Sequence, residues 1–281
     1  MERWTERPVD VGTGATLWTR TRGPDDGPVL LVVHGGPDWD GSYLADPLHR
    51  LPGVRVVLPD LRGCGRSTTG PGGCTPDAVV ADLLGLLDAL GVEQADLLGF
   101  SWGGLVAQRL ADAAPPRFRR LVLASTSVLP VDEAAFGDWP LRAERRAGAA
   151  AVWADPSLTG PEFARRAALA GARADVWRDD VLPGYLARLD RVRFSGAWLA
   201  TMRTGLLTSP RIPDPVARLT ATGLPALLLH GGQDMVFPAA LVAPTLAQLP
   251  GARAVVLAGA GHMAHVDDPD GWLAAVRDFL A

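Results

Sequence analysis

The segment Leu97-Leu-Gly-Phe-Ser-Trp-Gly103 constrains this chain most strongly, because an apolar run leads directly into a Gly-x-Ser-x-Gly turn. Gly99 and Gly103 leave room for neighbouring backbone, so the serine between them can occupy the apex of a sharp strand-to-helix turn. The helix expected to follow, about residues 103–113, points its N-terminal amides and the positive end of its dipole at that apex. The pattern therefore predicts a nucleophilic serine, Ser101, at the end of a parallel strand.

Such a serine needs two partners. A serine hydroxyl is a weak nucleophile until a base removes its proton, and the base needs an orienting carboxylate. Asp234 follows the apolar run 224–230, and His262 follows the apolar run 254–257. Both residues thus come at the carboxyl ends of strands, where parallel sheets gather their ligands. The chain order Ser, Asp, His predicts Asp234 as the acid and His262 as the base.

Other interpretations of these residues stay open at this point. Asp234 also suits an ordinary turn, because Gly-Gly-x-Asp is good turn chemistry. His262 competes with His265, but Gly259 and Gly261 before it fit a tight loop that presents the ring. His265 is then expected to brace the loop or line the pocket. Three further histidines are predicted to be structural: His34, His49 and His230.

A tetrahedral intermediate also needs backbone N–H donors for its oxyanion. One donor is expected from Trp102, the residue after the nucleophile. The other is expected from His34-Gly-Gly-Pro37, which follows the buried apolar run 28–33. Because Pro37 has no N–H, Gly36 is the predicted donor. Taken alone, the motif is also compatible with a simple turn after a strand.

With these residues, the chain resembles the α/β-hydrolase superfamily over essentially its whole length, and within it most resembles the proline iminopeptidase branch. The segments that carry the closer resemblance are His34-Gly-Gly-Pro37, Asp60-Leu-Arg-Gly-Cys-Gly-Arg-Ser67 and Ser101-Trp-Gly103. The resemblance implies an α/β fold with a mostly parallel central sheet flanked by helices. It also implies a Ser-Asp-His triad and an inserted helical cap.

Two segments depart from that branch. Pro37 is followed by Asp38-Trp-Asp40 where the branch usually has glycine, and the acid loop reads Gly231-Gly-Gln-Asp234 rather than Gly-Arg-Tyr-Asp. A peptidase of the branch also needs acidic cap residues to hold the substrate ammonium. The candidates here are Glu133, Glu144, Glu162, Asp175, Asp179 and Asp180. Many arginines accompany them, so the sequence selects no pair.

The organisation of the chain fits one α/β domain with an insertion. After a hairpin over about 7–21, the strands are expected at 29–33, 54–58, 95–100, 120–124, 226–229 and 254–257. Their continuous apolar character suits a sheet buried on both faces. The strand-helix rhythm stops at about residue 129 and resumes at about 213. We therefore expect a core of residues 1–128 and 213–281 and a helical cap of residues 129–212.

The cap is rich in aromatic residues, which predicts an apolar cavity above Ser101. The alternative is that these aromatics pack the cap onto the core. Met202 and Met235 are further candidates, although methionine is a general gap-filler. The predicted pocket residues are Trp39, Trp139, Trp153, Trp177, Trp198, Met235 and His265.

Composition excludes several classes of partner. The net charge is −4 and the 27 basic residues, all arginine, are scattered, which argues against nucleic acid. The start of the chain is charged and no apolar run is long enough to span a bilayer, so no signal or membrane segment is expected. A cytoplasmic location follows as the expectation. A disulfide between Cys64 and Cys74 is compatible with the sequence, but a reducing compartment favours free thiols.

Together these features predict a cofactor-independent serine hydrolase that cleaves an ester or amide bond of a small, largely apolar substrate. An aminoacyl amide is favoured by the resemblance alone. No Cys/His spacing suggests a metal. Serine at position 101 disfavours epoxide hydrolases and dehalogenases, which use an aspartate nucleophile. A lyase or cyclase of small-molecule biosynthesis, or a ligand receptor on the same scaffold, remains open, as does the oligomeric state.

Overall fold

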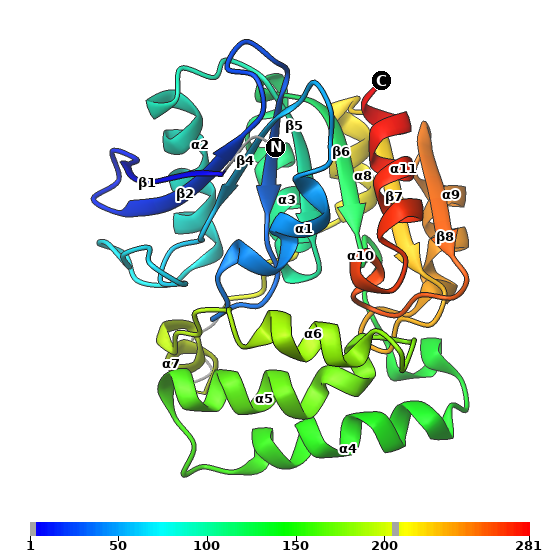
Figure 1. Cartoon of the computed structure of the whole chain (residues 1–281). Coiled ribbons are helices and arrows are strands. Elements are labelled where there is room, and N and C mark those ends of the chain that lie inside the picture. Colours follow the sequence, from blue (N-terminus) through cyan, green and yellow to red (C-terminus); the bar gives the residue numbers. More distant parts are fainter. Residues whose placement is uncertain (1–3, 204–207) are drawn as a thin grey trace.

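One twisted eight-stranded sheet organises the molecule, in the order β1-β2-β4-β3-β5-β6-β7-β8 (Figure 1). The computed structural model describes residues 4–203 and 208–281. The strands are β1 (Thr5–Asp10), β2 (Thr16–Arg22), β3 (Val29–Val33), β4 (Arg55–Pro59), β5 (Ala95–Phe100), β6 (Phe118–Ala124), β7 (Ala226–Gly231) and β8 (Ala252–Leu257). The pairs from β4 to β8 are parallel, whereas β1 and β2 run antiparallel at one edge.

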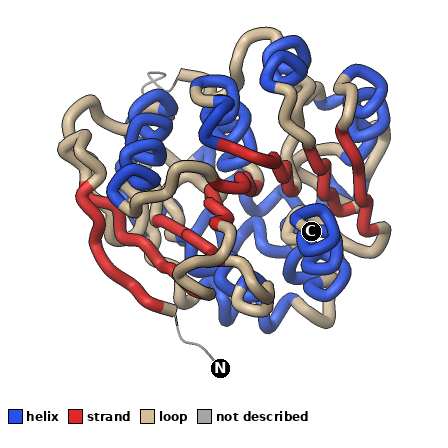
Figure 2. The backbone as a smooth tube through the Cα atoms, turned by 90° about the horizontal axis from the view of Figure 1, so that it is seen from above, coloured by secondary structure: helices blue, strands red, loops and turns tan. Residues whose placement is uncertain are grey.

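Helices cover both faces of the sheet, as the view along it shows (Figure 2). One face carries α2 (Pro76–Ala89), α3 (Trp102–Ala113), α8 (Pro215–Thr222) and α9 (Val242–Gln248). The other carries the 3₁₀ turn η1 (Gly41–Leu44), α1 (Ala45–Leu48), α10 (Ala264–Asp267) and α11 (Pro269–Leu280). The expected α/β fold, with a mostly parallel sheet between helices, is confirmed.

The continuous apolar runs follow from this double cover. In β3, Leu31 and Val33 belong to the core cluster on one face, while Leu30 and Val32 belong to the cluster on the other. Side chains alternate along a strand, so a strand covered on both faces needs apolar residues at every position. The strands start or end within two residues of the expected bounds.

A helical insert follows β6 and lies below the carboxyl edge of the sheet in Figure 1. It contains η3 (Glu133–Phe136), α4 (Pro140–Ala154), α5 (Gly160–Asp175), α6 (Leu182–Leu189) and α7 (Ala197–Arg203). The chain then returns to the sheet through α8, which packs against α3. Of the two segments expected as core and cap, residues 1–3 and 204–207 lie outside the described residues.

Two further expectations concern the environment of the chain. Cys64 and Cys74 are free and buried in the structure, and burial raises the pKa of the Cys74 thiol to about 11. Within residues 4–203 and 208–281, no helix is both long and apolar enough to cross a membrane.

Candidate active site

Ser101 lies at the turn between β5 and α3, and its backbone has φ 55° and ψ −125°. A non-glycine residue in this left-handed region is strained, and the surrounding contacts must hold it there. The Ser101 N–H donates to the Ala124 carbonyl, and the Ser101 carbonyl accepts from Gly104 N, both at 2.9 Å. A side chain at Gly103 would overlap the backbone of His34, which explains the glycine at this position.

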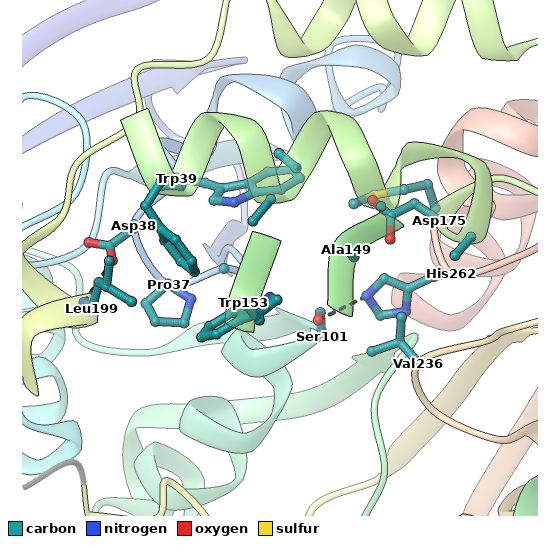
Figure 3. Close-up of a pocket in the computed structure, with 18 of the residues that line it drawn as sticks. Pro37, Asp38, Trp39, Ser101, Ala149, Trp153, Asp175, Leu199, Val236 and His262 are labelled. Carbon is teal, nitrogen blue, oxygen red and sulfur yellow. Dashed lines mark hydrogen bonds between the residues drawn. The ribbon is translucent and has the colours of Figure 1, made fainter. Parts of the chain in front are cut away.

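The structure brings the three residues of the predicted triad together. His262 Nε2 lies 3.0 Å from Ser101 Oγ, and His262 Nδ1 lies 2.9 Å from Asp234 Oδ2. Figure 3 shows the first contact as a dashed line at the floor of a cavity (Figure 3). All three side chains are less than 10% exposed. The imidazole therefore can accept the serine proton on one nitrogen while the other donates to the carboxylate.

The Asp234 carboxylate is also fixed from its other side. Its Oδ1 accepts from the backbone N–H groups of Val236 at 2.7 Å and Phe237 at 2.8 Å. His230 Nε2 lies 2.8 Å from the Phe237 carbonyl and 3.4 Å from Asp234 Oδ2. These contacts leave the carboxylate little freedom, so it holds one orientation of the His262 ring.

The electrostatics of the pair suit a general base. Burial disfavours the charged imidazolium, but the carboxylate of Asp234 and its hydrogen bond outweigh burial and raise the pKa of His262. Burial likewise disfavours the charged carboxylate, yet His262 and the backbone donors outweigh it and lower the pKa of Asp234. The acid therefore stays ionised and stabilises the imidazolium that forms when Ser101 loses its proton.

The predicted oxyanion donors lie on the two segments that border Ser101. Trp102 is the first residue of α3, and Gly36 lines the cavity with φ 116°, which requires glycine. A Cβ at Gly35 would come within 2.9 Å of the Ser101 Cβ, so this loop passes directly over the nucleophile. The Gly35 N–H donates to the Tyr43 hydroxyl at 2.8 Å, which anchors this loop, the oxyanion loop of residues 34–38.

The remaining histidines occupy different positions. His34 Nδ1 donates to the Gly35 carbonyl at 2.7 Å, and its Nε2 accepts from Leu61 N at 2.9 Å, so the ring braces the loop. His49 caps the C-terminus of α1, and His230 lies in β7 beside Asp234. His265 is fully buried against the Phe100 ring, with the ring centroids 5.1 Å apart, whereas His262 is the histidine that lies between Ser101 and Asp234.

A cavity of about 560 Å³ opens between Ser101 and the insert. Small residues of α4 and α5 form much of its roof, including Ala149, Ala164 and Ala168. In Figure 3, Pro37, Trp39, Trp153 and Leu199 gather at one end, and His262 and Asp175 at the other. The small side chains make room for a substrate, and the aromatic end can cover apolar groups.

Of the candidate pocket residues, Trp39, Trp153 and Met202 lie in the cavity wall. The structure places the other five elsewhere: Trp139, Trp177, Trp198, Met235 and His265 are absent from the wall. Trp198 is fully buried, and there its indole N–H donates to the Arg62 carbonyl at 2.8 Å and its ring packs on Trp102. Met235 is buried beneath the insert, where its carbonyl accepts from Arg142 Nε at 3.0 Å.

The other two tryptophans lie in the insert but face other neighbours. Trp139 is half-buried at the N-terminus of α4. Trp177 lies under the Arg145 guanidinium, whose carbon is 5.3 Å from the ring centroid. Neither tryptophan belongs to the cavity wall, although both lie in the aromatic insert that predicted them.

Two charged groups of the insert line the cavity beside His262. Asp175 accepts from the Tyr185 hydroxyl at 2.9 Å, and burial raises the pKa of Asp175 to about 6. Arg146 donates from Nη1 to the Met235 carbonyl at 3.1 Å, and burial together with Arg142 lowers the pKa of Arg146. In the sequence, Asp175 is one of six candidate carboxylates, and no pattern points to Arg146.

Four of the other cap carboxylates are paired with arginines outside the cavity wall. Glu133 pairs with Arg142, Glu162 with Arg166, Asp179 with Arg145 and Asp180 with Arg178. Glu144 is exposed on α4. Among the six, Asp175 is therefore the one that the described cavity wall contains.

Two buried aspartates to which the sequence assigned no role join the insert to the loops of the site. Asp38 lies directly after Pro37, with φ 71°, and its carboxylate accepts from Trp198 N, Leu199 N and the Ser195 hydroxyl at 2.8–3.0 Å. Asp267 accepts from the backbone of Gly261 and of the insert. The departure from the usual glycine after Pro37 thus has a structural role, since Asp38 anchors α7.

The described part of the chain contains no group of three or more His, Cys, Asp or Glu side chains placed to hold a metal ion. The arrangement of Ser101, His262 and Asp234 can instead perform acyl transfer through proton transfer alone.

The chain is similar to several known proteins. Proline iminopeptidase of Levilactobacillus brevis is 29% identical over 90% of this chain and 88% of its own length. Epoxide hydrolase 3 of Siraitia grosvenorii is 36% identical, over 40% of this chain and 39% of that protein. The crystal structure of a proline iminopeptidase-related protein from Thermus thermophilus superposes with a TM-score of 0.71 at 28% identity, covering 99% of this chain and 97% of that one.

The family model described as alpha/beta hydrolase fold matches residues 28–269, which span β3 to the start of α11 and include Ser101, Asp234 and His262. The chain belongs to the α/β-hydrolase family.

Proposed function

We propose that this protein is a cofactor-independent serine hydrolase that cleaves an ester or amide bond of a small, largely apolar substrate. Ser101 attacks the carbonyl carbon while His262 Nε2 takes its proton, and Asp234 holds the imidazole orientation. The amides of Gly36 and Trp102 stabilise the oxyanion. Collapse of the tetrahedral intermediate transfers the proton from His262 to the leaving group and leaves an acyl group on Ser101. Water activated by His262 then releases the acid.

The observation that carries the proposal is the continuous chain of contacts from Ser101 Oγ through the His262 ring to Asp234 Oδ2, with distances of 3.0 and 2.9 Å. Both distances lie within hydrogen-bond reach, as general-base activation of a serine requires. The positive φ of Ser101 adds support, because strain at a serine between a strand and a helix presents the hydroxyl to the cavity.

The cavity supports a substrate with one extended apolar part. Its volume of about 560 Å³ suits a small molecule, and most of its wall is alanine, aromatic or aliphatic. We propose that residues 129–212 form a cap that excludes water during the reaction, because α4 and α5 cover the cavity above Ser101. The leaving group must lie within reach of His262 Nε2, which protonates it.

An aminoacyl amide is the finer proposal, supported by the similarity to proline iminopeptidases over nine tenths of the chain. Such a substrate carries an ammonium group, which needs a carboxylate in the cavity. Asp175 is the cap carboxylate in the wall, and it is ionised above its pKa of about 6. Asp175→Asn should therefore raise KM for aminoacyl substrates while leaving neutral esters nearly unchanged.

The test is a side-by-side assay of prolyl and alanyl arylamides and short p-nitrophenyl esters with the wild type, Ser101→Ala and Asp175→Asn. Hydrolysis that Ser101→Ala reduces on the order of 10⁴-fold or more supports the acyl-enzyme route. Arylamide turnover that depends on Asp175 supports the aminopeptidase. Ester turnover alone contradicts the aminoacyl amide, and substantial turnover by Ser101→Ala contradicts the serine hydrolase.

A further inference from the structure

The loop that carries His262 is joined to the insert by one buried carboxylate, Asp267. Its Oδ2 accepts from Gly261 N at 2.7 Å and from Trp177 N at 2.9 Å. Its Oδ1 accepts from Arg178 N at 2.9 Å. Gly261 directly precedes His262, whereas Trp177 and Arg178 belong to the insert after α5. The two segments are about ninety residues apart in sequence, yet a single side chain holds both.

Backbone contacts on the other side of His262 also hold its loop, the base loop, against the insert. The Met263 N–H donates to the Asp175 carbonyl at 2.7 Å. A Cβ at Gly261 would lie 2.9 Å from Trp177 N and 3.0 Å from the Asp175 carbonyl oxygen, so the two backbones touch here. Gly261 therefore lies against the insert, Met263 is hydrogen-bonded to it, and Asp175, at the start of this segment of the insert, lines the cavity.

The hydrogen bonds to the Asp267 carboxylate are expected to be stronger than those between neutral groups. Asp267 is fully buried, and N–H groups that donate to a carboxylate form shorter and stronger hydrogen bonds than neutral pairs. Three donors converge on its two oxygens from two segments, so neither segment can shift alone without leaving a buried polar group unsatisfied. The base loop and the cavity roof are thus fixed to a common point.

We propose that Asp267 is a positioning residue that fixes the His262 ring relative to Ser101 and couples it to the cavity roof. This inference rests on the proposed function of His262 as the general base. Asparagine has nearly the same shape but replaces one acceptor oxygen with an NH₂ donor. In Asp267→Asn, that NH₂ must face at least one of the backbone N–H donors. At least one hydrogen bond between this side chain and the base loop or the insert is therefore lost.

The neighbouring Asp268 provides a matched control. It is also an aspartate, and its Oδ1 accepts from Gly271 N at 2.9 Å as the N-cap of α11. Asp268→Asn keeps an acceptor for this helix cap, because asparagine and aspartate cap helices about equally well, and it leaves the hydrogen bonds of Asp267 in place. A second test variant is Gly261→Ala, which inserts a methyl group between the base loop and the insert while Asp267 stays in place.

The experiment measures kcat and KM for p-nitrophenyl acetate and the rate of labelling of Ser101 by a fluorophosphonate, after circular dichroism has shown each variant to be folded. Asp267→Asn and Gly261→Ala should lower kcat and the labelling rate on the order of 10- to 100-fold, because small misplacements of a catalytic group are costly. Asp268→Asn should keep both rates near those of the wild type. Folded variants with wild-type rates and a lower melting temperature would show that Asp267 is only structural.

A readout without turnover separates this inference from the proposed function. The His262 Nδ1 proton, hydrogen-bonded to Asp234, should give a low-field ¹H NMR signal that His262→Gln removes. We expect Asp268→Asn to keep this signal and Asp267→Asn to broaden or lose it. If the wild type hydrolyses and labels nothing, the proposed function fails, while the NMR signal still decides the role of Asp267. An unchanged signal in Asp267→Asn overturns the inference.

Discussion

Ser101 sits in a backbone conformation that costs free energy, and the residues around it were recognisable because they serve that conformation locally. Gly99 and Gly103 flank it, β5 precedes it and α3 follows it. Asp234 and His262 were predictable for the same reason, since each follows a short apolar strand that ends at the same edge of the sheet. Residues whose position depends on a neighbouring strand and turn can be found from the sequence.

At this scale, the first prediction concerns the pH dependence of hydrolysis. The general base must be neutral, and Asp234 raises the pKa of His262 above its usual value near 6.5. We therefore expect kcat/KM to fall as the pH drops, with an apparent pKa above 6.5. Asp234→Asn should move that pKa down and lower kcat on the order of 10⁴-fold. An apparent pKa that is the same in both proteins would contradict the assigned pair.

The individual pocket residues were far less predictable. Trp198 and Trp153 both belong to the aromatic insert, but Trp198 is fully buried against Trp102 whereas Trp153 is 48% exposed at the cavity. Their local sequences do not indicate which of the two is buried. The difference in burial arises from how α7 packs against the oxyanion loop and how α4 packs against α5. Asp267 and Asp268 are adjacent and alike, and only the tertiary contacts distinguish an anchor from a helix cap.

The elements of the insert are attached to the sheet domain at both ends of the cavity. Asp38 fastens the start of α7 to the oxyanion loop, and Asp267 fastens the segment after α5 to the base loop. The sequence predicted the insert from its break in the strand-helix rhythm. It did not predict these attachments, because single aspartates in loops are common and their partners lie 90 and 160 residues away.

A second prediction follows for α7. Asp38→Asn tolerates the positive φ of Asp38 but loses one acceptor for the N–H groups of Trp198 or Leu199. Because Leu199 and Met202 line the cavity, we expect KM for a bulky ester to rise on the order of tenfold, with a smaller change for an acetate ester. Steady-state assays with p-nitrophenyl acetate and octanoate measure this difference.

Ser195→Ala is the matched control for that prediction, since it removes only the hydroxyl that donates to Asp38 at 3.0 Å. Its effect on KM for the octanoate should be smaller than that of Asp38→Asn. Equal KM increases for the short and the long ester in Asp38→Asn would show that the anchor does not set the shape of the cavity.

For the whole molecule, burial of a neutral histidine couples stability to pH. His265 is enclosed by the rings of Tyr43, Phe100 and Trp272, and burial, with Arg188 and His262, lowers the pKa of His265 well below 6.5. The unfolded chain therefore binds a proton at a pH where the folded chain does not. The contribution of the neutral, buried His265 to the free energy of unfolding is therefore complete above pH 6.5 and decreases as the pH falls below 6.5.

We expect His265→Leu to flatten the loss of the free energy of unfolding between about pH 6.5 and pH 5, measured by urea denaturation. Part of the slope should remain, because burial also lowers the pKa of His34. His262 acts in the opposite direction, since Asp234 raises its pKa and protonation then favours the folded state. A slope in His265→Leu as steep as that of the wild type would contradict this assignment.

The central claim is that Ser101 carries the acyl group during turnover, and intact-protein mass spectrometry of the enzyme quenched during hydrolysis of a p-nitrophenyl ester tests it most directly. The p-nitrophenolate leaving group needs little protonation by His262, so the acyl group can accumulate in the wild type before water releases it. We predict a mass increase of one acyl group per chain, located by proteolysis to the peptide that contains Ser101, and none in Ser101→Ala. An acyl group on another residue, or hydrolysis by Ser101→Ala at a rate near that of the wild type, would contradict the account.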